Sequence, residues 1–197
     1  MKIAGYRFEG RRALSGLAAV TMTVLLAGCA LPPPRELPPP RAAPLAPLAA
    51  PRPLVALALG GGGARGFAHI GVIKVLEGSG IVPDIVVGSS SGAIVAALYA
   101  GGMSGVELER TAVMLERDDL IDVVFEGRFM VRGALLQEFV NRTLGYRAIE
   151  ELARPFALVA TERGSGAMTV FNRGDTGLAV RASVAVPDLF LPVAIAG

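Results

Sequence analysis

Two glycine-rich turns, each placed after a short apolar run, constrain this chain more than any other feature of its sequence. The apolar runs cover 54–59 and 84–88, and the turns that follow them cover 60–66 and 88–92. Apolar residues recur at helical spacing after each turn. The order strand, helix, strand, helix predicts a parallel βαβ unit with a right-handed crossover. Both turns then lie at the carboxyl ends of adjacent parallel strands, where α/β proteins place their sites.

The rest of the folded region continues this alternation, so we assign it to the α/β class. The first apolar run is continuous and does not alternate with polar residues, which fits a buried parallel strand, and the second is a further short apolar strand. The expected helices cover 64–77, 93–100, 104–116, 133–144 and 176–185, and further strands cover 156–161 and 168–171.

The second turn reads Gly88-Ser89-Ser90-Ser91-Gly92 and contains a G-x-S-x-G pattern. Ser90 is the only serine of the chain with glycine both two residues before and two residues after it. A sharp turn from strand to helix puts strained backbone angles on its middle residue, and small neighbours let the turn close. The Ser90 hydroxyl would then project above the sheet as a nucleophile. The alternative interpretation is a tight turn without chemistry.

The first turn contains Gly61-x-Gly63-x-x-Gly66, a spacing that also fits a dinucleotide-binding loop. That function requires an acidic residue at the carboxyl end of the second strand, and Asp84 lies at its start instead. A P-loop is excluded because Gly66 is followed by Phe67 and not by lysine. The glycines do expose several backbone N–H groups beside a helix N-terminus, which favours negative charge there. A nucleophile opposite such donors is the arrangement that acyl transfer requires.

Composition narrows the chemistry further. One cysteine excludes an internal disulfide and any metal site with several cysteine ligands. Acyl transfer by a serine nucleophile needs no metal and no organic cofactor, so we expect neither. The single histidine, His69, lies in the first helix, where packing or capping is its expected role. The net charge is +2, yet the first twelve residues hold four basic side chains and one acidic side chain. The remaining 15 basic and 16 acidic residues give no electrostatic footprint for nucleic acid.

The first 53 residues read as an export signal and a spacer. A basic start, an apolar run and small residues after it describe a secretory signal over 1–28. Its end, Leu26-Ala27-Gly28-Cys29, resembles the bacterial lipobox, which implies lipidation of Cys29 and a membrane anchor. Ten of the 14 prolines fall within 29–53, so we expect this segment to form an extended tether. The alternatives are a plain signal peptide or an uncleaved anchor, and a PxxP ligand in place of the tether.

Three segments of the folded region together resemble the bacterial patatin-like phospholipase family. They read ALGGGGARGFAHIGVIKVLEGSGI, IVVGSSSGAIVAALYAGG and RASVAVPDLFLPV. The resemblance implies a three-layer αβα fold with a mainly parallel sheet, a lipid or acyl-ester substrate, and a Ser-Asp dyad whose nucleophile is Ser90. The other implied site residues are Gly61, Gly62 and Gly63 as the oxyanion hole, Arg65 and Gly66 as positioning residues, and Gly88 and Gly92 as parts of the nucleophile elbow.

The aspartate of that dyad has no counterpart in this sequence. In the family it belongs to an Asp-Gly-Gly or Asp-Gly-Ala motif that follows the segment resembling 190–193. The chain contains no Asp-Gly dipeptide, and Asp84, Asp175 and Asp188 lack the expected context, so structural roles are expected for them. We therefore expect 54–197 to be a partial hydrolase domain, incomplete at its C-terminus.

These observations lead to one main hypothesis and two alternatives. The main hypothesis is a serine acyl-ester hydrolase of the phospholipase or lipid acyl hydrolase type, carried by an exported bacterial lipoprotein. Because Ala30 follows Cys29 where some bacteria place a retaining aspartate, we expect an outer-membrane address. The alternatives are a catalytically inactive, truncated lipoprotein or binding module, and a nucleotide-binding protein. The oligomeric state is left open.

Overall fold

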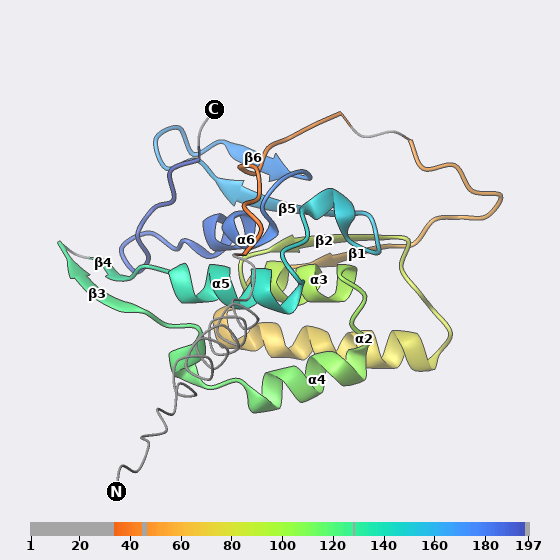
Figure 1. Cartoon of the computed structure of the whole chain (residues 1–197). Coiled ribbons are helices and arrows are strands. Elements are labelled where there is room, and N and C mark those ends of the chain that lie inside the picture. Colours follow the sequence, from red (N-terminus) through yellow and green to blue (C-terminus); the bar gives the residue numbers. More distant parts are fainter. Residues whose placement is uncertain (1–33, 45–46, 128, 196–197) are drawn as a thin grey trace, which may run out of the picture. The chain divides into compact units, whose positions relative to one another are not determined.

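The computed structural model describes residues 34–44, 47–127 and 129–195 (Figure 1). The predicted signal peptide and Cys29 lie outside the described residues. The chain from Glu36 onward forms one compact unit. Among the described helices, none combines the length and the apolar character of a membrane span.

A four-stranded sheet organises this unit, with the strand order β1-β2-β5-β6. Strands β1, β2 and β5 are parallel, and β6 runs antiparallel to β5. The four strands coincide with the predicted ones and cover β1 (Ala56–Leu59), β2 (Ile85–Ser89), β5 (Phe156–Thr161) and β6 (Met168–Phe171). The predicted parallel unit at the start of the domain is therefore confirmed.

Five α-helices follow the predicted pattern within a few residues at each end. They are α2 (Ala68–Gly78), α3 (Ser91–Ala100), α4 (Gly105–Met114), α5 (Ala134–Thr143) and α6 (Thr176–Val184). Three short 3₁₀ helices lie between these elements, namely η1 (Gly63–Phe67), η2 (Arg117–Asp119) and η3 (Ile149–Glu151). The glycine-rich turn thus enters α2 through η1.

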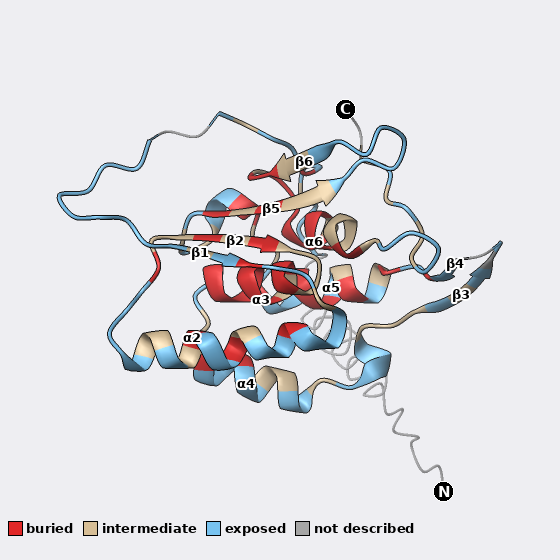
Figure 2. Cartoon of the chain, turned by 180° about the vertical axis from the view of Figure 1, so that it is seen from behind, coloured by how far each residue is buried: buried red, intermediate tan, exposed pale blue. Residues whose placement is uncertain are grey.

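The helices of the described residues lie on one side of the sheet (Figures 1 and 2). Leu59, Val86 and Leu158 face them and are buried, whereas Ala56 and Ala58 on the opposite face are exposed. The α/β class and the mainly parallel sheet are confirmed, but the second helix layer of the expected three-layer arrangement is not among the described residues. Because Ala56 and Ala58 are exposed, the prediction that β1 is a buried strand is wrong for one of its faces.

Helix α3 is the centre of the core. It packs against β2 and contacts α5 and α6 as well, and its residues from Gly92 to Ala100 are buried except for Ile94. A helix that is apolar all round has no solvent face and is stable only when it is covered on all sides. The turn that carries Ser90 is therefore joined directly to the most enclosed helix of the unit.

An antiparallel hairpin, β3 (Val123–Glu126) and β4 (Phe129–Val131), was not predicted from the sequence. It projects from the body of the unit in Figure 1. Val131 also pairs with Phe190 from the far end of the chain. That second partner is a non-local contact, which local apolar patterning does not reveal.

The described part of the Pro-rich segment is not free of the fold. Residues 36–43, here called the proline arm, lie along the loop that follows β6. The N–H of Arg41 donates to the carbonyl of Arg173 at 3.0 Å. The Asn172 side chain accepts from the N–H of Ala43 and donates to its carbonyl, both at 2.8 Å. Part of the predicted tether is therefore docked on the folded unit.

Candidate active site

The turn between β2 and α3 holds Ser90 in a strained backbone conformation. Its φ of 52° and ψ of −129° lie in a region that residues with a side chain rarely adopt. Such angles persist only where the surroundings enforce them. The strain that the G-x-S-x-G pattern predicts at its middle residue is thus present.

The two glycines of the pattern are required because other atoms occupy the space of a side chain. A Cβ at Gly88 would lie 2.5 Å from the Cα of Ala93 and 2.9 Å from the Cβ of Ala96. A Cβ at Gly92 would lie 2.3 Å from the carbonyl oxygen of Leu59. These packed contacts on both sides close the turn around Ser90.

The glycine-rich loop approaches Ser90 directly. A Cβ built on Gly61 would lie 3.0 Å from the Cβ of Ser90 and 3.6 Å from its Oγ. A Cβ on Gly66 would lie 2.7 Å from the Oγ of Ser91, so the loop also packs against the start of α3. The structure therefore brings together the two turns that the sequence placed at one sheet edge.

Two side chains bind carbonyl groups of this loop. The imidazole Nε2 of His69 lies 2.8 Å from the carbonyl oxygen of Gly60. The carbonyl of Gly62 accepts the backbone N–H of Arg65 at 3.2 Å, and the guanidinium Nε of Arg65 lies 3.5 Å from it. In a trans peptide the C=O and the following N–H point in opposite directions. Holding these two carbonyls therefore orients the N–H groups of Gly61 and Gly63.

These loop N–H groups are available to a ligand. In the part of the chain that the structure describes, the N–H groups of Gly61 and Gly62 donate no hydrogen bond to another residue. The positive φ of Gly63, 58°, makes the loop turn sharply into η1. Consecutive unpaired N–H groups at the start of a helix form a favourable place for negative charge.

One residue beneath the turn was missed by the sequence analysis. The backbone N–H of Ser90 donates to the Oγ of Ser183 at 2.8 Å, and that hydroxyl donates to the carbonyl of Val159 at 2.6 Å. Ser183 lies in the last turn of α6, next to the buried Val184. Its only sequence signal is a hydroxyl in the otherwise largely apolar last turn of a helix.

Asp84 and Asp175 make contacts that stabilise the fold. Asp84 lies before β2, at the sheet edge opposite Ser90, and pairs with Arg52 at 2.6 Å. The side-chain hydrogen bond from Arg52 and the backbone N–H of Val55 lower the pKa of Asp84. Asp175 is the N-cap of α6 and accepts from Leu178 at 2.9 Å. Asp84 is therefore misplaced for a dinucleotide site, as the sequence indicates.

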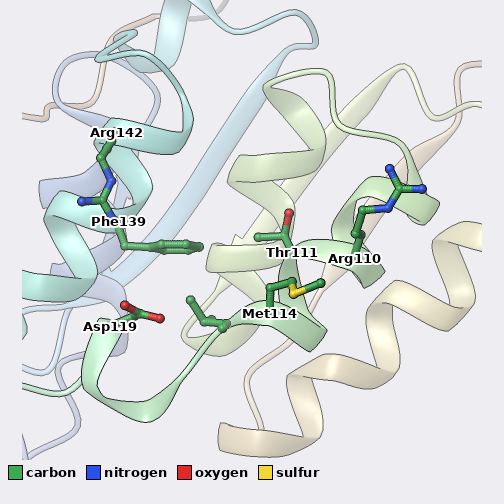
Figure 3. A pocket seen from close by; sticks show the side chains of 7 residues that line it. Arg110, Thr111, Met114, Asp119, Phe139 and Arg142 are labelled. Atoms are coloured by element: carbon green, nitrogen blue, oxygen red, sulfur yellow. The ribbon is translucent and has the colours of Figure 1, made fainter.

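Ser90 lines neither of two hollows on the described surface. One, of about 370 Å³, opens between α4, η2 and α5, where Phe139 and Thr111 face each other across it (Figure 3). Its other lining residues are Arg110, Met114, Leu115, Asp119 and Arg142. A second, also about 370 Å³, runs along the exposed face of α2 between Ala68 and Leu76. Within the described residues, no group of three or more His, Cys, Asp or Glu side chains is placed to hold a metal ion.

Comparison with known proteins shows the family to which this chain belongs. The family described as Patatin-like phospholipase matches residues 57–197. An uncharacterised NTE family protein of Mycobacterium bovis is 37% identical over 147 residues, which cover 74% of this chain and 41% of that protein. Patatin-like phospholipase domain-containing protein 6 of Mus musculus is 33% identical over 145 residues, which cover 71% of this chain and 11% of that protein. The chain belongs to the patatin-like phospholipase family and spans less than half the length of these relatives.

Solved structures give the same fold at low sequence identity. ExoU of Pseudomonas aeruginosa, solved with SpcU, aligns with a TM-score of 0.57 at 19% identity over 68% of this chain and 39% of that chain. VipD of Legionella pneumophila aligns with a TM-score of 0.57 at 16% identity over 71% of this chain and 44% of that chain. These likenesses support the patatin-like architecture that the sequence resemblance implies.

Proposed function

We propose that this chain is a serine hydrolase of lipid acyl esters in which Ser90 is the nucleophile. The observation that carries the proposal is the approach of the glycine-rich loop to Ser90, with a Cβ on Gly61 only 3.0 Å from the Cβ of Ser90. Membership of the patatin-like phospholipase family supports the ester-hydrolase class and a lipid substrate. The strained turn supports the choice of Ser90 among the serines of the chain.

In the proposed reaction the Ser90 Oγ attacks the acyl carbonyl carbon while a base takes the hydroxyl proton. The carbonyl oxygen gains the negative charge, which the N–H groups of Gly61, Gly62 and Gly63 would stabilise. Collapse of this intermediate expels the protonated alcohol and leaves an acyl-serine, which water then hydrolyses. The loop N–H groups are set in place beforehand by the contacts that His69 and Arg65 make with loop carbonyls.

The base of this reaction is not assigned to a residue of the chain. The family places it in an Asp-Gly motif, and the 197 residues contain no Asp-Gly dipeptide. Asp84 and Asp175 are engaged in framework contacts, so neither is proposed. This feature is the reason to keep a second candidate function, a patatin-fold lipoprotein that binds lipid without cleaving it.

A fluorophosphonate probe separates the two candidates, because it forms a covalent bond only with an activated serine. The full chain is incubated with the probe, and the labelled residue is located by mass spectrometry. We expect labelling at Ser90, its loss in Ser90→Ala, and its retention in Ser91→Ala, whose hydroxyl is buried without a hydrogen-bond partner among the described residues. A folded chain that takes up no probe contradicts the hydrolase and favours the binding protein.

We also propose that residues 1–28 are removed on export and that Cys29 is lipidated, so that the chain is held at a bacterial membrane. The lipobox-like end of the apolar N-terminal run supports this proposal. The test is incorporation of an alkyne fatty acid during expression in a bacterial host, with Cys29→Ala as the control. Labelling that persists in Cys29→Ala, or none in the full chain, contradicts it.

A further inference from the structure

The hydrogen-bond ladder between β2 and β5 ends at the residue before Ser90. Ser89 pairs with Val159, and earlier in the ladder the N–H of Val86 donates to the carbonyl of Pro155, one residue before its pairing partner. In a parallel pair this pattern repeats every second residue. The series continues through Gly88 to Ser90, and the ladder acceptor of the Ser90 N–H would be the carbonyl of Val159.

The Ser183 hydroxyl stands in the place of this ladder bond. It accepts from the Ser90 N–H at 2.8 Å and donates to the Val159 carbonyl at 2.6 Å. A single hydroxyl thereby satisfies both groups after the strands have separated. The chain leaves the ladder at this point and enters the strained turn without an unpaired buried backbone group.

This orientation of Ser183 is unusual for a hydroxyl within a helix. A serine in a helix commonly returns its hydroxyl to the carbonyl three or four residues earlier. Ser183 instead directs its hydroxyl out of α6 toward a different element, where it links three segments that are distant in sequence. The two glycines of the turn restrain Ser90 by packing, and Ser183 restrains it by a directional bond.

We propose that Ser183 is a positioning residue that holds the backbone of Ser90 in its reactive conformation; this rests on the proposed function of Ser90. Without the hydroxyl, the Ser90 N–H and the Val159 carbonyl lose their partners. The packing at Gly88 and Gly92 keeps the turn closed, so the ladder does not re-form. The turn then relaxes among several conformations, and the Ser90 Oγ is less often aligned with the loop N–H groups.

The test compares Ser183→Ala, Ser183→Thr and Ser91→Ala in the full chain. Threonine retains the bridging hydroxyl, and Ser91→Ala removes a neighbouring hydroxyl that has no partner among the described residues. For the fluorophosphonate probe, we expect the maximal labelling rate to fall about tenfold or more in Ser183→Ala, while the half-saturating probe concentration stays within about twofold. Ser183→Thr and Ser91→Ala should keep the wild-type rate within about threefold.

A second readout does not depend on catalysis. Amide hydrogen exchange at Ser90 should be about tenfold faster or more in Ser183→Ala and unchanged in Ser183→Thr, because only the former leaves this N–H unpaired. Unchanged exchange in Ser183→Ala overturns the proposal, as does an equal loss of labelling in a folded Ser183→Thr. If Ser183→Ala does not fold, the threonine variant alone decides by the same criterion. If the wild type does not label, the proposed function fails, and the exchange at Ser90 still decides the role of Ser183.

Discussion

The contact between Gly61 and Ser90 allows a sharp prediction, because a single methyl group suffices to disturb it. In Gly61→Ala the new Cβ lies 3.0 Å from the Cβ of Ser90 and 3.6 Å from its Oγ. The first distance is too short for two side-chain carbons, so the loop and the turn must separate by a few tenths of an ångström. The φ of Gly61 lies outside the left-handed region, so the backbone itself does not exclude alanine there.

The expected cost in reactivity follows from this displacement. Misplacing reacting groups by 1 Å costs about 100-fold, and losing one oxyanion donor costs about 100-fold to 1,000-fold. A shift of less than half that distance, with all donors retained, predicts a loss of about tenfold, or about 1.4 kcal/mol of transition-state stabilisation. The free energy of unfolding should change by less than about 1 kcal/mol, because the lower entropy of the unfolded alanine chain opposes the strained contact.

The chain offers a matched control one residue away. A Cβ at Gly60 meets nothing within 4 Å, so Gly60→Ala adds the same methyl group without a contact. The assay is the rate of fluorophosphonate labelling at Ser90, with hydrolysis of a short-chain nitrophenyl ester as a second measure and thermal melting as a check of folding. Equal labelling rates in Gly61→Ala and Gly60→Ala would refute the reasoning, because they would show that the loop does not face the nucleophile.

Three further predictions concern the framework. Gly92→Ala should lower the free energy of unfolding by about 2–3 kcal/mol, because its Cβ would meet two backbone carbonyl oxygens. Gly71→Ala, at an open position within a helix, should raise the free energy of unfolding by about 0.5–1 kcal/mol. Urea melts of both variants measure these changes. Asn172→Ala should release the proline arm at Ala43, which limited proteolysis would detect as faster cleavage before the first strand, and an unchanged rate argues against docking. In Asp84→Asn, the free energy of unfolding should depend less on pH in the acid range than it does in the wild type. The lowered pKa of Asp84 stabilises the fold above the unfolded pKa, and this contribution is lost as the pH falls through the folded value, so equal acid curves contradict it.

The parts of the site that follow from local chemistry were predictable. The strained Ser90 could be inferred because G-x-S-x-G is itself the local requirement of a sharp strand-to-helix turn. The approach of Gly61 followed from one topological rule, that parallel neighbours end at the same edge. Neither inference needed knowledge of the rest of the fold.

Contacts between distant segments were not predictable in the same way. Ser183 lies 93 residues from Ser90, and nothing in its neighbourhood reveals which backbone N–H its hydroxyl meets. Asn172 contacts Ala43 across 129 residues, so composition alone predicts a tether at the proline arm and does not reveal its docking. The sequence also overestimates the burial of β1. A continuous apolar run shows that a strand can be buried on both faces, but it does not show whether other elements cover both.

The docked proline arm changes the mechanical character of the N-terminal segment. At 3.1 Å per residue, a free Pro-rich spacer would span at most about 74 Å over the 24 steps from residue 29 to residue 53, whereas the seven steps from residue 29 to residue 36 would span at most about 22 Å. The arm is fastened at the loop before α6, and Ser183 stands at the other end of that nine-residue helix, about 13 Å away. If Cys29 is lipidated as proposed, docking of the proline arm shortens the segment that separates the membrane anchor from the folded unit. The largest distance between Ser90 and the membrane would then depend mainly on the dimensions of the folded domain and less on the length of a flexible linker.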